Sequence, residues 1–230
     1  MENIDKILYM FWTGDNPLTD NRKKSIELIK NTSGLKVIIL DKNTIFDFEL
    51  QNNRFHGAYK YLSAVHKSDY LRAYFMNFYG GCYSDIKPNI FNWLPYVNIL
   101  ENNPYKDVVG YSEEKPEDIG IEENDPEQFN MRKKYFIFSG NCSYICKKNS
   151  FITNLWYKKI TNKLDEKMPL LQKFPAQEPR DFNNKIINGI GSQYPIKWTE
   201  ICGNIFHKIC WLNNDRFLNI LPRPICYNYQ

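Results

Sequence analysis

The sequence predicts an α/β domain with a mostly parallel sheet flanked by helices. Short apolar runs typical of buried strands alternate with stretches of helical periodicity along the chain, which is the pattern of strands joined by helical crossovers. No linker, internal repeat or low-complexity stretch divides the chain. We therefore expect residues 1–230 to form one domain, a length that single α/β units commonly reach.

The first elements follow this alternation. Ile4 to Trp12 is apolar and runs into the turn-forming residues 13–17, which predicts a buried first strand feeding a loop. Residues 20–30 have an acidic start and a basic end before Gly34, as expected of a helix. Residues 35–40 form the next apolar strand. Because ligands collect at the carboxyl ends of strands in such sheets, the loop at 13–17 should border a binding site.

The middle of the chain predicts a helix, two glycines and a short strand. A helical stretch is expected near 57–65, and Ser68 is a candidate N-cap for a helix reaching Tyr79. Gly80 and Gly81 would end that helix, since glycine adopts the left-handed conformation without steric cost. The following strand, 82–86, closes at Pro88.

Polar side chains fall together in this region. Asp69 and Arg72 lie one turn apart on the predicted helix. Alternation along the strand places Tyr83, Asp85 and Lys87 on one face.

The second half of the chain continues the α/β pattern. Strands are expected near 107–111, 135–139, 142–146 and 218–221, and helices from Ser150 to Met168 and over 199–211.

The pattern of Asp69, Arg72, the two glycines, Tyr83 and Asp85 resembles the sugar-binding region of DXD-motif glycosyltransferases. The families concerned are the mannosyltransferase and capsular-polysaccharide group and the glucosylating clostridial toxins. The resemblance implies a GT-A fold, a single Rossmann-like domain with a mostly parallel sheet. It also implies transfer of a sugar from a UDP- or GDP-sugar to a glycan, lipid or protein hydroxyl, with retention of anomeric configuration, in the manner of polysaccharide-building hexosyltransferases.

The same resemblance suggests a role for each residue. It makes Asp69 and Arg72 ligands of sugar hydroxyls and places Tyr83 near the donor phosphates. Asp85 would bind the ribose or a metal and, with Arg72, carry catalysis. Trp12 would stack on the nucleotide base, an interaction worth ~1–3 kcal/mol; the alternative for Trp12 is a core residue that closes the first strand.

Lys87 departs from the family pattern, because it stands where the second aspartate of the motif would bind Mn²⁺ or Mg²⁺. Two accounts of the cofactor stay open. Either a metal site is built from Asp85 and distant ligands, or the Lys87 ammonium lies near the phosphates and reduces the need for a metal. Lys87 as a solvated strand-end lysine is the third alternative. The missing aspartate also leaves open a catalytically inactive sugar-nucleotide or glycan-binding module.

Charge and hydropathy exclude several classes. The formal charge of +4 is spread along the chain rather than clustered, which does not indicate nucleic-acid binding. A mild positive balance favours an anionic sugar nucleotide, or peripheral contact with a membrane surface. The sequence has no signal peptide and no apolar run long enough to span a bilayer, so a cytoplasmic location is expected.

Four further features complete the expectations. Residues 112–132 are strongly acidic, which predicts a solvated loop or, alternatively, a lid. Residues 188–192 contain two glycines and could form a second lid over the donor. The 6 cysteines lack a C-x-x-C pair, so they are expected to be small buried apolar residues. His207 is weighed as a metal ligand and set aside as a hydrogen-bonded histidine.

Overall fold

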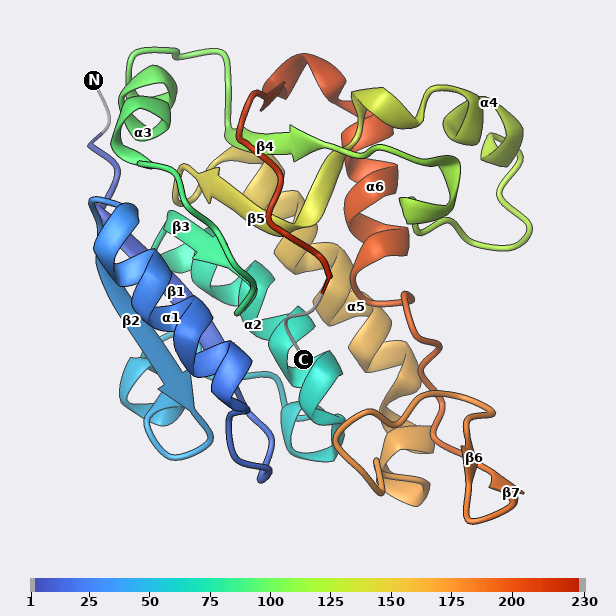
Figure 1. Ribbon diagram of the computed structural model, residues 1–230. Coiled ribbons are helices and arrows are strands. Elements are labelled where there is room, and N and C mark those ends of the chain that lie inside the picture. The colour runs from blue at the N-terminus through green and yellow to red at the C-terminus, as the bar shows by residue number, and fades with distance from the viewer. Residues whose placement is uncertain (1–2, 228–230) are drawn as a thin grey trace.

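A computed structural model describes residues 3–227 and shows a six-stranded central sheet of order β2-β1-β3-β5-β4-β8 (Figure 1). The strands are β1 (Ile7–Trp12), β2 (Lys36–Asp41), β3 (Gly81–Ser84), β4 (Val108–Ser112), β5 (Ser139–Cys146) and β8 (Phe217–Asn219). The pairs β1–β2, β1–β3 and β4–β8 are parallel. Only β5 runs against its neighbours in this sheet, β3 and β4. This confirms the predicted fold class, an α/β arrangement with a mostly parallel sheet flanked by helices.

Helices cover both faces of the sheet. Successive side chains of each strand point to opposite faces, so each strand contributes to a core on either side. Leu8, Met10 and Cys82 belong to the core under α1 (Asp20–Thr32) and α3 (Leu94–Glu101). Tyr9 and Tyr83 belong to the core of the opposite face, which α2 (Ala64–Phe78), α5 (Phe151–Lys173) and α6 (Gly203–Leu212) cover.

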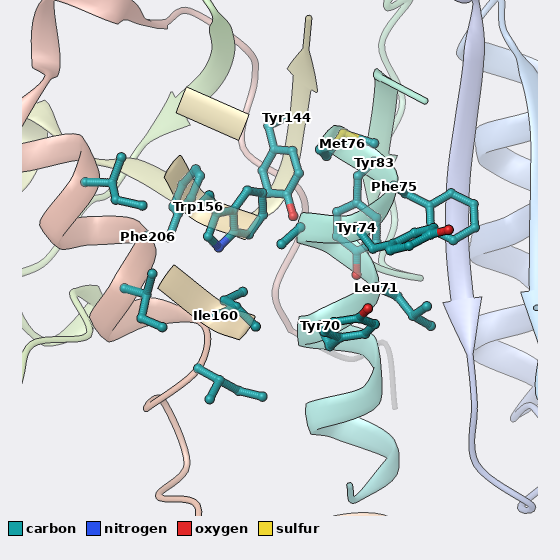
Figure 2. Close-up of a cluster of buried hydrophobic side chains, with 14 of the residues drawn as sticks. Tyr70, Leu71, Tyr74, Phe75, Met76, Tyr83, Tyr144, Trp156, Ile160 and Phe206 are labelled. Carbon is teal, nitrogen blue, oxygen red and sulfur yellow. The ribbon is translucent and has the colours of Figure 1, made fainter. Parts of the chain in front are cut away.

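The second face has an aromatic core (Figure 2). Tyr83 and Tyr144 stack across β3 and β5 with ring centroids 5.3 Å apart. Trp156 of α5 and Phe206 of α6 close the same core at 4.7 Å. Full burial of one such apolar side chain contributes roughly 1.5–3 kcal/mol to the stability of the fold. The packing on this face therefore stabilises the position of β3, which leads to Asp85.

Helix α2 begins earlier than the sequence predicts. Its N-cap is Ser63, whose side chain accepts a hydrogen bond from the His66 N–H. Ser68 therefore lies inside the helix, and the prediction of a cap at Ser68 is wrong. The expected helix over 57–65 is a 3₁₀ turn (Tyr59–Tyr61) followed by the start of α2.

Gly80 ends α2 as expected. Its φ is +68°, and a Cβ there would lie 2.8 Å from the Lys148 backbone nitrogen, so only glycine fits this turn.

One predicted strand is absent. Residues 135–137 form a 3₁₀ turn, and β5 starts at Ser139, so the strand expected at 142–146 is the second half of a longer one. The helix that Ser150 caps is confirmed and extends to Lys173.

The remaining elements are short. They are α4 (Gln128–Lys133) and the hairpin strands β6 (Ile186–Ile187) and β7 (Ile190–Gly191). Within residues 3–227, no helix combines the length and the apolar character needed to cross a membrane.

Candidate functional site

A cavity of about 610 Å³ opens at the carboxyl ends of β1 and β3. Its walls come from residues 11–22, the first half of α2 (64–72), residues 83–87 and the segment 178–198. In Figure 1 this is the edge toward which the arrow of β2 points, between the loop after β1, the start of α2 and the β6–β7 hairpin. Parallel strands carry ligands at this edge. Trp12, Arg72, Tyr83, Asp85 and Lys87 all line the cavity, so the structure brings five of the expected site residues together.

Asp85 lies at the centre of a charged cluster. Its Oδ1 is 3.1 Å from Arg72 Nη2 and accepts a hydrogen bond of 2.6 Å from the Tyr83 hydroxyl. Its Oδ2 is 3.0 Å from Lys87 Nζ. Both carboxylate oxygens are therefore occupied, and the two cations lie on either side of one anion.

The charges of this cluster stabilise one another. Burial alone would raise the pKa of Asp85, but the charges of Arg72 and Lys87 and the Tyr83 hydrogen bond outweigh burial and hold that pKa well below its usual range. Burial would likewise lower the pKa of Lys87, yet Asp85 raises it above its ordinary value. Lys87 is only 11% exposed; the strand-end lysine is not a solvated one.

Arg72 is positioned from several directions. Its guanidinium carbon lies 4.9 Å from the centre of the Tyr83 ring, and Nη1 donates to the Asn141 carbonyl oxygen at 3.1 Å. These contacts fix the planar guanidinium between α2, β3 and β5. A fixed fork of donors is suited to carboxylate or phosphate oxygens.

Asp69 lies behind Arg72 rather than in the cavity wall. Its Oδ1 is 3.5 Å from Arg72 Nη1, and its side chain is buried. Burial raises its pKa against the opposing charge of Arg72. In this structure Asp69 contacts the cavity through Arg72.

Trp12 is a half-buried residue of the cavity wall. Its indole N–H donates to the Asn16 carbonyl at 2.7 Å, which ties the loop after β1 to the ring. Arg22 of α1 places its guanidinium carbon 4.9 Å from the ring centre and donates to the Ile86 carbonyl at 3.1 Å. Trp12 lines the cavity and also packs against the core under α1 and α3; its stacking on a nucleotide base stays a prediction.

The segment 174–198 closes the cavity from the side. Its backbone is tied to the region where α2 begins, through Val65 N–H to Pro179 O at 3.1 Å and Ala176 N–H to Tyr61 O at 3.0 Å. It contributes Glu178, Arg180, Lys185 and Trp198 to the wall. The glycines at 189 and 191, expected as a lid, lie instead in the exposed β6–β7 hairpin outside the wall.

Five of these cavity residues, Arg22, Glu178, Arg180, Lys185 and Trp198, are not predicted by the sequence analysis. Arg22 could have been found, because it lies in the first turn of the helix that follows the predicted binding loop. Arg180, Lys185 and Trp198 carry no local signal, since they reach the site only through the path of a segment without regular periodicity.

The groups around Asp85 do not fit a divalent cation. Each of its oxygens already faces a cationic side chain, whereas Mg²⁺ is held by one or two carboxylates with free oxygens, together with waters and substrate phosphates. Across residues 3–227 there is no group of three or more His, Cys, Asp or Glu side chains placed to hold a metal ion.

The acidic stretch 112–132 is anchored in the core at two points, but Glu114, Glu117, Glu122 and Glu123 are exposed, so the predicted solvated loop is confirmed for these side chains. Ile119 and Met131 are buried in the core. Cations from the end of the chain neutralise the acidic residues: Arg223 pairs with Glu114 and Asp118, and Lys208 lies 2.7 Å from Asp125.

Glu113 and His207 form a buried neutral pair beside this stretch. Glu113 Oε1 lies 3.7 Å from His207 Nε2. Burial raises the pKa of Glu113 to about 8 and lowers that of His207 to about 4. Neither group is charged at neutral pH, so this contact is not an ion pair. His207 accepts from the Gly120 N–H at 2.9 Å, which confirms it as a hydrogen-bonded histidine.

The cysteines are free thiols. Cys82, Cys146, Cys202 and Cys210 are buried as expected, whereas Cys226 is exposed. Cys142 lies 2.8 Å from Lys87 Nζ and thus belongs to the wall behind the charged cluster.

The comparisons with known proteins assign no family to this chain. No protein-family model matches, and no curated protein does either. Five solved chains match. One is the PaToxG glycosyltransferase, which is 15% identical, with a TM-score of 0.44 over 92% of this chain and 69% of that chain. At this identity and TM-score, the similarity identifies neither a substrate nor a catalytic residue.

Proposed function

We propose that this protein is a glycosyltransferase that takes a sugar from a nucleotide-diphosphate donor. The observation that carries the proposal is the charged cluster at the carboxyl edge of the sheet. There, Arg72 and Lys87 present two fixed cations to a cavity that Trp12 also lines. A nucleotide sugar offers the complementary chemistry, namely a planar base and a dianionic diphosphate.

The residues divide the donor between them. Trp12 stacks on the base, and Arg22, whose guanidinium lies over the same ring, meets the ribose or the first phosphate. Arg72 and Lys87 contact diphosphate oxygens, and Tyr83 and Asp85 keep both cations in place. Asp69 acts through Arg72. This arrangement supports a donor site at the same edge as the family pattern implies.

Catalysis in this proposal is electrostatic. Departure of the nucleoside diphosphate leaves negative charge on an oxygen, and preorganised donors that meet that charge stabilise the transition state. The Lys87 ammonium and Arg72 guanidinium supply this stabilisation, so that no divalent cation is needed for donor binding. We propose UDP- or GDP-sugars as donors, a glycan, lipid or protein hydroxyl as acceptor, and a retaining outcome.

A catalytically inactive sugar-nucleotide-binding module is the second candidate. The pairing of both Asp85 oxygens favours it, because a carboxylate that is fully engaged in positioning cations is less free to take part in chemistry.

One experiment separates the two candidates. Thermal shift is measured with UDP-, GDP- and dTDP-sugars, each with manganese and with EDTA, and release of free sugar is followed in the same samples. A transferase raises its midpoint with one donor and hydrolyses that donor slowly, whereas a binding module shifts without releasing sugar. No shift with any nucleotide sugar would refute both.

A further inference from the structure

A second cavity of about 400 Å³ adjoins the first, and Thr13 lines both. It lies between the end of β2 and the start of α2, and its other walls come from residues 42–60 and Lys67. Neither the charged cluster around Asp85 nor Trp12 contributes to it. The proposed donor chemistry therefore leaves this cavity unused.

Aromatic rings form one side of the second cavity. Phe55 and Tyr59 have ring centroids 5.2 Å apart, and Phe46 packs edge-on to Tyr59 at 6.1 Å. Phe46 is 53% exposed although it is a large apolar residue. Exposure of the Phe46 ring to water is unfavourable, and a flat apolar group packed on the ring would remove that contact with water.

The other side of the cavity is basic. Lys42, Lys60 and Lys67 all line it. The single acidic residue among its lining residues, Glu49, is already neutralised, because Arg54 lies 2.7 Å from Oε2 and the Phe55 N–H donates to Oε1 at 2.8 Å. The cavity is thus cationic toward a ligand.

Lys67 is the central cation of this wall. It is half-buried on α2, with Nζ 5.7 Å from the centre of the Tyr59 ring. Burial lowers its pKa, and the charge of Asp15 opposes that shift without reversing it. Within residues 3–227, no carboxylate forms a salt bridge with Lys67, whereas Lys42 pairs with Asp15. An ammonium that is partly desolvated and lacks a carboxylate partner gains most from an anionic ligand.

We propose that the second cavity is a binding site for an aromatic anion, a flat ring that bears a phosphate or carboxylate. The ring packs on Phe46 and Phe55, and the anionic group pairs with Lys67 and Lys60. Because Thr13 joins the two cavities, such a ligand lies next to the donor. Its role as the recognised end of an acceptor rests on the proposed function, whereas the binding itself does not.

Phenyl phosphate is the probe, titrated calorimetrically into the full chain. Three variants are compared: Lys67→Gln, Phe46→Ala and the control Lys23→Gln, an exposed lysine of α1 that pairs with Asp20. Loss of one charge-assisted hydrogen bond is worth roughly 1.5–3 kcal/mol, so Lys67→Gln should weaken binding at least about tenfold. Phe46→Ala should weaken it severalfold, and the control should match wild type.

Titrations with other ligands define the chemistry that the second cavity recognises. Inorganic phosphate should bind more weakly than phenyl phosphate, and benzyl alcohol should not bind. Benzoate distinguishes a carboxylate ligand from a phosphate.

Equal binding to wild type and Lys67→Gln would overturn the proposal, as would absence of binding. If Lys67→Gln does not fold, Phe46→Ala, at an exposed position, decides the same question. Failure of the nucleotide-sugar shifts would refute the donor proposal alone, and failure of phenyl phosphate binding would refute this one alone.

Discussion

Asp85 and Glu113 follow β3 and β4 at the same edge of the sheet, on either side of β5, yet they reach opposite charge states. Asp85 is 19% exposed and stays ionised, because two cations contact it. Glu113 is 5% exposed, and burial together with the charge of Asp118 raises its pKa to about 8, although the charges of Arg223 and Lys87 oppose that shift. The difference teaches that the partners of a carboxylate decide its charge here, and burial alone does not.

The largest effect should come from removing the anion of the charged cluster. We expect Asp85→Asn to abolish sugar transfer and also to destabilise the fold by roughly 3–5 kcal/mol, because Arg72 and Lys87 lose their buried partner. The sequence alone favours an intact fold for this variant, since it gives no sign of the two ion pairs. Donor turnover and urea unfolding measure the two effects. Transfer within a factor of two of wild type would refute the assignment.

Glu113→Gln tests the other member of the comparison. The folded-state pKa of Glu113 is raised above its ordinary value of 4.5 to about 8. The folded protein therefore binds more protons than the unfolded chain in this window, and the free energy of unfolding falls as pH rises through it. Glutamine cannot ionise. We expect the variant to match wild type at pH 4 and to be more stable by roughly 4–5 kcal/mol at pH 9.

Chemical unfolding at several pH values measures this effect. For Asp85 the sign is reversed, because its pKa is depressed: that stabilisation is present above pH 4 and is lost as the pH falls below it. Parallel stability curves for wild type and Glu113→Gln would contradict the assigned charge state of Glu113.

Arg72→Lys probes geometry within the charged cluster at constant charge. One ammonium cannot contact Asp85, the Asn141 carbonyl and a ligand oxygen at once, as the guanidinium can. We expect a loss of at least about 1.5 kcal/mol in donor binding or transition-state stabilisation. Steady-state kinetics of donor hydrolysis measure this loss. Lys23→Arg is the control for a lysine–arginine exchange at an exposed position. Unchanged kinetics would assign Arg72 a structural role only.

Lys87→Asp should give the most specific change, a change in the metal dependence of donor binding. It would place a second carboxylate beside Asp85, where wild type has the Lys87 ammonium 3.0 Å from Oδ2. We expect wild type to bind donor in EDTA and the variant to bind manganese more tightly and to need it for donor binding. Titration of the donor into both proteins, with manganese and with EDTA, measures this. If wild-type binding vanishes in EDTA and returns with manganese, Lys87 does not replace the cation.

The sequence predicts well what local patterns determine. The strand ending at Trp12, the helix capped by Ser150 and the turn at Gly80 follow from apolar runs, a capping side chain and a positive φ. The predicted cap at Ser68 was wrong because the helix begins about a turn and a half earlier, where Ser63 accepts the His66 N–H.

The site was predictable only in part. Trp12, Arg72 and the residues of β3 lie close together in sequence or at strand ends, so motif and topology reach them. The direction of β5 and the path of residues 174–198 depend on long-range pairing that no periodicity reports. For the same reason the packing of Glu113 against His207, ninety-odd residues later, leaves no local trace.

The position of β5 sets the order in which this protein can be completed during synthesis. β5 lies between β3 and β4, so the two halves of the sheet join only when residues 139–146 arrive. Until then β3 has an open edge on one side, and β4 has no partner that precedes it in the chain. Open strand edges are templates for pairing with other chains, and emerging chains fold from the N-terminus onward. A nascent chain that stalls between residues 112 and 139 is therefore at its greatest risk of aggregation.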